Sequence, residues 1–203
     1  MLTVGKDVAG VERLLSSGRL ECPVCGQRLA GWGHARLRVI RGEGGGRWRL
    51  RPRRAMCGGC RRTHVLLPVS VLARRADAVT VIGAALAGAA AGQGHRKIAG
   101  RLGRPAATVR GWLRRFASRA GALRAAFTGL LREVDADPLM PGPAGSPLAD
   151  AVAAVLAAAV AVARRWQPAV FMVSPWELAA AVTSARLLAR GTGADLINTG
   201  CPW

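Results

Sequence analysis

The chain has few acidic residues, and this shortage determines its net charge. Its 203 residues include 11 Asp and Glu against 30 Lys and Arg, which gives a formal net charge of +19. The whole excess lies in residues 1–125, with 25 basic and 5 acidic side chains, because residues 126–203 hold 5 and 6. A strongly basic first part favours a polyanionic partner, whereas the neutral remainder carries no such signal.

Lysine is scarce as well, since 28 of the 30 basic residues are Arg. The planar guanidinium group of Arg suits bidentate contacts with phosphate and with guanine, which favours nucleic acid as the polyanion. A GC-rich genome would also favour Arg over Lys, but it would not explain the uneven placement of the charge.

Long apolar runs are missing too. The uncharged stretches 78–92 and 151–163 are shorter than the roughly 20 residues of a membrane span and are rich in Ala, so we expect packed helices there. Residues 1–20 lack the continuous apolar core of a secretory signal. We therefore expect a cytoplasmic, nucleoid-associated protein.

The common catalytic motifs are also absent. The sequence has no Gly-rich phosphate loop ending in Lys, no G-x-S-x-G and no H-E-x-x-H. Only six acidic residues follow position 125, in stretches that have helix and linker patterns. We therefore expect a binding protein without catalytic residues, not an enzyme.

Of five cysteines, four form two Cys-x-x-Cys pairs: Cys22, Cys25, Cys57 and Cys60. This pairing and the odd total favour a metal site over a disulfide framework. Four thiolates complete the tetrahedron of Zn²⁺ and leave no open position, so we expect a structural zinc ion in a zinc ribbon. Unligated core cysteines or a redox pair are the alternatives. We expect His34 and His64 to be surface or packing residues and Cys201 to be incidental.

Residue patterns divide the chain into five parts. Alternating runs at 35–40 and 47–51, separated by a Gly-rich turn at 42–46, predict a β-hairpin, and 65–67 predicts another strand. Helical patterns cover 71–91, 95–102, 105–118, 146–165 and a stretch from the capping box at Ser174 to near Gly191. We therefore expect an α+β fold that is mostly α. The expected parts, in chain order, are an N-terminal arm or helix (1–20), a small four-cysteine zinc ribbon (21–68), a helix-turn-helix DNA-binding domain (69–125), a linker (126–145) and a C-terminal helical segment of unknown role (146–203).

The segment 95–116 has the pattern of a helix-turn-helix. Gly103 suits a turn with positive φ, and the spacing predicts these inward-facing residues: Ile98, Ala99, Leu102, Val109, Trp112, Leu113 and Phe116. We expect three residues of the second helix to contact bases: Ala106, Ala107 and Arg110. Further DNA contacts are expected from Arg96, Lys97, Arg101, Arg104, Thr108, Arg114 and Arg115. The alternative is an ordinary helical hairpin with a solvated Arg face.

Four runs carry a resemblance to a known family: Cys22-Pro23-Val24-Cys25-Gly26, Cys57-Gly58-Gly59-Cys60-Arg61-Arg62-Thr63, Ile98-Ala99-Gly100-Arg101-Leu102-Gly103 and Thr108-Val109-Arg110-Gly111-Trp112-Leu113. Over about residues 20–120 the chain resembles the N-terminal DNA-binding region of bacterial insertion-sequence transposases. It is also similar to an actinobacterial helix-turn-helix family. The resemblance implies zinc-dependent, sequence-specific binding of double-stranded DNA. The implied partner is a separate transposase or integrase subunit, and a homodimer is a compatible assembly.

After residue 125 the chain departs from a complete transposase. The common type needs three carboxylates that bind two metal ions on a mixed sheet, whereas residues 126–203 have helix and linker patterns, so two-metal chemistry is not expected. The expected function is a transposase-like accessory that reads DNA and lacks its own catalytic domain. The alternatives are a transcriptional regulator, or a zinc-ribbon protein-interaction module with nonspecific nucleic-acid binding, anchored by Trp166 and Trp176.

Overall fold

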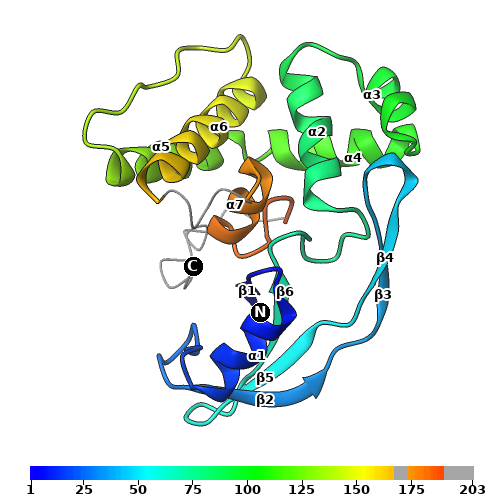
Figure 1. Ribbon diagram of the computed structural model, residues 1–203. Coiled ribbons are helices and arrows are strands. Elements are labelled where there is room, and N and C mark those ends of the chain that lie inside the picture. Colours follow the sequence, from blue (N-terminus) through cyan, green and yellow to red (C-terminus); the bar gives the residue numbers. More distant parts are fainter. Residues whose placement is uncertain (167–172, 190–203) are drawn as a thin grey trace.

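The structure is a computed structural model, and it describes residues 1–166 and 173–189 (Figure 1). Helices and strands are both present, so the predicted mixed α+β class is confirmed. The described strands are β1 (Leu2–Val4), β2 (Leu29–His34), β3 (Arg38–Arg41), β4 (Arg47–Leu50), β5 (Arg53–Cys57) and β6 (Thr63–Pro68). The described α-helices are α1 (Val8–Ser16), α2 (Val79–Ala90), α3 (His95–Leu102), α4 (Ala106–Ala117), α5 (Ala120–Val134), α6 (Pro147–Arg165) and α7 (Pro175–Val182).

The N-terminal part has a small hydrophobic core of its own. Four strands form one sheet in the order β1-β6-β5-β2, in which β1 runs parallel to β6 and places Leu2 beside Leu66. Val11 and Leu15 of α1 are buried in the same core, together with Cys22 and Cys57. Residues 1–20, expected to be a separate arm or helix, therefore complete the core around the cysteines.

Strands β3 and β4 form a separate two-stranded hairpin. Arg38 lies opposite Leu50 and Arg41 opposite Arg47, and a 3₁₀ turn at Glu43–Gly45 closes the tip, as the Gly-rich run predicts. Ile40 is fully buried, but in the helical core and not in the small one. The hairpin therefore extends from the small sheet to the side of α3 and α4 (Figure 1).

The remaining helices share the larger core. Helices α2, α3 and α4 contact one another, α5 packs along α6, and α7 contacts α2 and α6. Gly83 of α2 faces the ring of Trp176, which is 8% exposed. The predicted capping box of α7 is confirmed: the Ser174 hydroxyl accepts from the Glu177 amide, and the Glu177 carboxylate accepts from the Ser174 amide.

Three helix boundaries differ from the sequence predictions. Helix α2 begins at Val79, because Val71 and Ala78 pair in a β-bridge ahead of it. Helix α5 continues to Val134, so the first part of the predicted linker is helical. Helix α7 ends at Val182 and not near Gly191, because the residues that follow, Ser184 and Ala185, have positive φ. Each boundary is set by contacts or dihedral angles that residue composition does not encode.

Within the described part of the chain, α6 is the one helix long and apolar enough to cross a bilayer. Its buried residues, including Val152, Val155 and Val162, belong to the helical core and pack against α5 and α2. A core helix passes the same length and hydropathy test, so this match is weak support for a membrane span.

We predict that Gly83→Ala destabilises the protein by about 1–3 kcal/mol, because the added methyl group would overlap the ring of Trp176. Gly129→Ala in α5 is the matched control, since no atom lies within 4 Å of its added Cβ. There, the higher helix propensity of Ala should stabilise the protein by roughly 0.5–1 kcal/mol. Urea denaturation measures both changes, and equal effects of the two substitutions would contradict the proposed contact.

Candidate metal centre and basic surface

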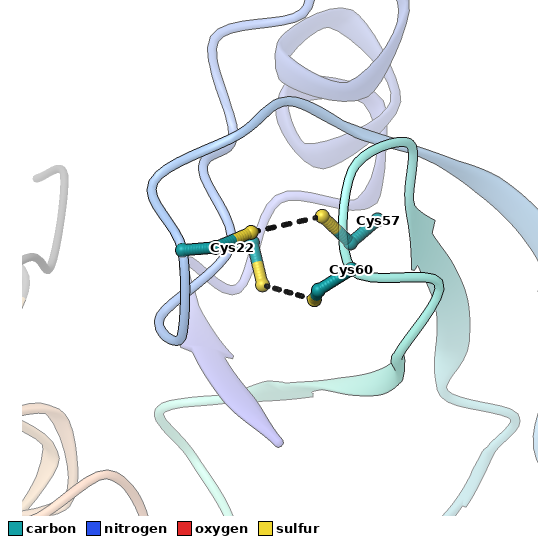
Figure 2. Close-up of side chains that lie close together, drawn as sticks. Cys22, Cys57 and Cys60 are labelled. Atoms are coloured by element: carbon teal, nitrogen blue, oxygen red, sulfur yellow. Dashed lines mark hydrogen bonds between the residues drawn. The ribbon is translucent and has the colours of Figure 1, made fainter.

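The four cysteines of the two Cys-x-x-Cys pairs meet at one end of the small core. Their sulfur atoms all lie within 4.8 Å of one another. The Sγ atoms of Cys25 and Cys57 are 3.4 Å apart, and those of Cys22 and Cys60 are 3.7 Å apart. In Figure 2 Cys22 extends from one turn toward Cys57 and Cys60, which lie on the facing turn. The fold therefore brings together residues more than thirty positions apart in the chain.

Two similar turns hold these thiols in place. In the first, the Cys22 amide donates to the Gln27 carbonyl, and the Gly26 amide donates to the Cys22 carbonyl. In the second, the Cys57 amide donates to the Arg62 carbonyl. The residue after each pair has positive φ, which Gly26 adopts easily (φ 70°) and Arg61 adopts at 59°. Each turn thus directs two sulfurs to the same side.

The cluster fits a metal ion such as zinc. A tetrahedral zinc with Zn–S bonds of about 2.3 Å separates its sulfurs by about 3.8 Å, close to the spacing found here. Burial raises the pKa of Cys57, but hydrogen bonds from the Cys60 amide, the Cys25 thiol and the Gly59 amide outweigh it and lower the pKa to about 7. The hydrogen bond from the Arg62 amide lowers the pKa of Cys60, but burial and the neighbouring thiols outweigh it and raise the pKa to about 11, so the cluster favours one thiolate over several in the absence of a metal. Hydrogen bonds that stabilise a thiolate also favour metal binding, because the thiolate is the ligand form.

His64 lies against this cluster. It is buried, and its Nε2 is 3.4 Å from the sulfur of Cys22. Burial lowers the pKa of His64, and the positive charges of the N-terminus and Arg62 lower it further, so the ring is held neutral. A neutral ring protonated at Nε2 can donate to a Cys22 thiolate and orient it. His34, by contrast, is exposed on β2.

Nine of the ten predicted DNA-contacting residues are exposed or half-buried. Six are exposed on α3 and α4: Arg96, Lys97, Arg101, Ala107, Arg110 and Arg114. Three are half-buried: Ala106, Thr108 and Arg115. Gly103 has the predicted positive φ of 60°, and the inward faces are confirmed by the burial of Ile98, Ala99, Val109, Trp112 and Phe116. Leu102 and Leu113 are half-buried against the same core.

Arg104, the tenth residue expected to contact DNA, has a side chain that is 7% exposed and engaged in contacts within the protein. Its Nε donates to Oδ1 of Asp77 at 2.6 Å, and its Nη2 donates to the Gly42 carbonyl at 2.7 Å. Arg41 donates to both carboxylate oxygens of Asp77 from another side, at 3.1 and 2.7 Å. Asp77 therefore joins the β3-β4 hairpin to the α3–α4 turn.

The hairpin adds three basic side chains to those on α3 and α4, and none of the three was among the predicted DNA contacts. Arg47, Arg49 and Arg51 are exposed. None of the ion pairs within the described ranges involves these three residues. Their alternating spacing places them on one face of the strand and its extension. In the sequence, the alternation of Arg with Trp48 and Leu50 indicates that these arginines share one face of a strand. The Asp77 contacts place the hairpin that carries them beside α4.

Comparison with known proteins gives one match. A family described as Domain of unknown function (DUF6431) matches residues 22–112, from the first cysteine of the cluster to Trp112 in α4. The match spans less than half of the chain, and it includes all four cysteines, the hairpin and α3. No curated protein and no solved structure matches the chain.

We predict that the protein purifies with one zinc ion per chain and that Cys57→Ser loses it. Because the small core contains both Cys22 and Cys57, loss of the metal should unfold that core and lower the melting temperature. Cys201→Ser is the control, since Cys201 belongs to neither Cys-x-x-Cys pair and lies outside the described residues. Elemental analysis with circular dichroism measures both effects. A metal-free Cys57→Ser protein with unchanged folding would contradict a structural role.

We predict that Asp77→Asn destabilises the protein by about 3 kcal/mol, because it leaves buried Arg104 without its counter-charge. Asp137→Asn removes an exposed carboxylate and should change stability by less than about 0.5 kcal/mol. Urea denaturation of the zinc-loaded variants compares them. Equal stability of the two variants would show that the Asp77 contacts do not hold the hairpin to the helices.

Proposed function

We propose that this protein is a zinc-dependent, sequence-specific binder of double-stranded DNA that lacks a catalytic domain of its own. In this proposal residues 21–68 form a zinc ribbon, and α3 and α4 form a helix-turn-helix. The observation that carries it is the surface of α4: Ala107, Arg110 and Arg114 are exposed in a single stripe, while the opposite face is buried in the helical core.

The dimensions of α4 suit the major groove. Its 12 residues span about 18 Å along the helix axis. An α-helix with its side chains is about 10–12 Å in diameter, which fits a major groove about 12 Å wide. Ala107 near the N-terminal end permits close approach to base edges. Arg110, one turn later, can donate two hydrogen bonds to a guanine, and Arg114 can reach a phosphate. Arg115 has a different role, because its guanidinium already donates to the Gly111 carbonyl.

The surroundings of α4 support duplex DNA over an isolated basic helix. Arg96, Lys97 and Arg101 are exposed on α3, where they can contact phosphates next to the groove. The tip of the hairpin lies at the α3–α4 turn, since its Gly42 carbonyl accepts from Arg104, and Arg47 and Arg49 are exposed on the adjoining strand β4. We infer that the hairpin arginines contact DNA phosphates. Such contacts would orient α4 on the duplex but would not distinguish one base sequence from another.

Two biological roles remain compatible with such a reader. The resemblance to insertion-sequence transposases favours an accessory that recognises the ends of a mobile element and recruits a separate transposase or integrase. A transcriptional regulator would use the same surface. A protein-docking module has less support, because Trp176, one of its two expected anchors, is buried against Gly83, whereas Trp166 is exposed and lies under Arg165.

We predict that selection from random DNA duplexes with zinc-loaded protein yields a defined motif, and that Arg110→Ala binds this motif with about 1–3 kcal/mol lower affinity. The loss should be greatest at one base position. Arg132→Ala is the matched control, because Arg132 is an exposed residue of α5 and forms no ion pair with a described carboxylate. Fluorescence anisotropy at several salt concentrations measures both affinities.

Two results would contradict the proposal. If selection enriches no sequence above random duplex, the protein does not read bases. If Arg110→Ala and Arg132→Ala bind the selected site equally well, α4 is not the recognition helix, even when the parent protein binds DNA.

A further inference from the structure

A cavity of about 890 Å³ lies between the small sheet and the helical body. Its walls come from the start of β3, from β6, from the loop before α2, from α4 and from the segment after α7. Six arginines line it: Arg36, Arg38, Arg74, Arg75, Arg115 and Arg186. No carboxylate is among the described lining residues.

Three of these arginines have no carboxylate partner within the described part of the chain. None of the ion pairs there involves Arg36, Arg38 or Arg186. Arg38 is the clearest case, because its Nε and Nη2 are buried without a hydrogen-bond partner, while its Nη1 donates to the Arg75 carbonyl. Arg38 as a whole is half-buried, but guanidinium nitrogens buried without a hydrogen-bond partner or counter-ion are costly, so the arrangement favours a bound anion.

A further arginine behind the wall adds to the positive potential. Arg119 is buried and donates to the Arg186 carbonyl. Burial lowers the pKa of Arg119, and the neighbouring charge of Arg186 lowers it further. A single chloride ion would not offset so many guanidinium groups, whereas a ligand with several negative charges would.

The rest of the lining is apolar. Val65, Leu67, Ala185 and Leu188 form the other part of the wall. The volume falls in the range of about 300–1,000 Å³ typical of small-molecule sites. A ligand that combines linked phosphates with a flat, weakly polar group would match both the charge and the apolar wall.

We propose that this cavity binds a small polyphosphorylated molecule of the nucleoside di- or triphosphate class. Arg36, Arg38 and Arg186 line the cavity and can hold the phosphates, and the apolar wall would accept the base. The ligand would connect β3, the loop before α2 and the segment after α7, so it should raise the melting temperature. This proposal does not rest on DNA binding, because none of the exposed residues assigned to base contacts lines the cavity.

The test is calorimetric titration of the full, zinc-loaded chain with ATP, AMP and inorganic pyrophosphate at physiological ionic strength. We expect one saturable site for ATP, weaker binding of pyrophosphate, and much weaker binding of AMP. Arg186→Ala should weaken ATP binding about tenfold or more, since it removes charge-assisted hydrogen bonds. Because Arg186 is exposed, this variant should fold even if Arg38→Ala does not. Arg132→Ala is the control and should bind ATP like the parent protein.

Three outcomes would overturn the proposal. The first is no saturable binding of ATP or pyrophosphate. The second is binding that Arg132→Ala weakens as much as Arg186→Ala, which indicates a diffuse charge effect. The third is displacement of ATP by a short random DNA duplex, together with equal loss of duplex and ATP binding in Arg186→Ala, because the cavity would then belong to a nucleic-acid surface. A protein that binds ATP but enriches no DNA motif would instead overturn the proposed function and leave this site intact.

Discussion

The carboxylate of Asp77 is the contact on which the arrangement of the molecule depends. It is buried between the guanidinium groups of Arg41, from the hairpin, and Arg104, from the α3–α4 turn. Arg104 also binds the hairpin through the Gly42 carbonyl. Because a buried charge without a partner is strongly unfavourable, these groups stabilise one another only in this arrangement. The position of the hairpin beside α4, and with it the burial of Ile40, follows from this arrangement.

The cysteine cluster is the second constraint, and it acts on the smaller core. That core contains few large side chains, and two of its members are Cys22 and Cys57. A core of this size gives little stability by itself, so a metal held by four thiolates would contribute a large share. The parallel pairing of β1 with β6 and the packing of α1 close the same core. Metal binding and the folding of residues 1–68 are therefore expected to be coupled.

Helix α4 connects the two proposals. Arg110 and Arg114 point to solvent, where the proposed DNA surface lies, whereas Arg115 lines the arginine-rich cavity. The first part of the chain thus supplies most of the arginines of both proposed sites: an exposed surface proposed to bind DNA and a recessed cavity proposed to bind a small polyanion. A ligand in the cavity would contact the helix that carries the proposed base-reading residues, which links the two sites physically.

The sequence by itself determined the features that depend on local spacing. The positive φ of Gly103, the buried face of α4 and the capping box of α7 were all predicted, because each is set by residues a few positions apart. Only the tertiary structure decided which charged and aromatic side chains are exposed and can contact a partner. Arg104 is buried by residues 27 and 62 positions away, and Trp176 by α2, so neither side chain has the exposure that local sequence patterns suggest. The arginine-rich cavity likewise joins segments far apart in the chain, and side-chain partners at such separations follow from packing and charge pairing, which local sequence patterns do not encode.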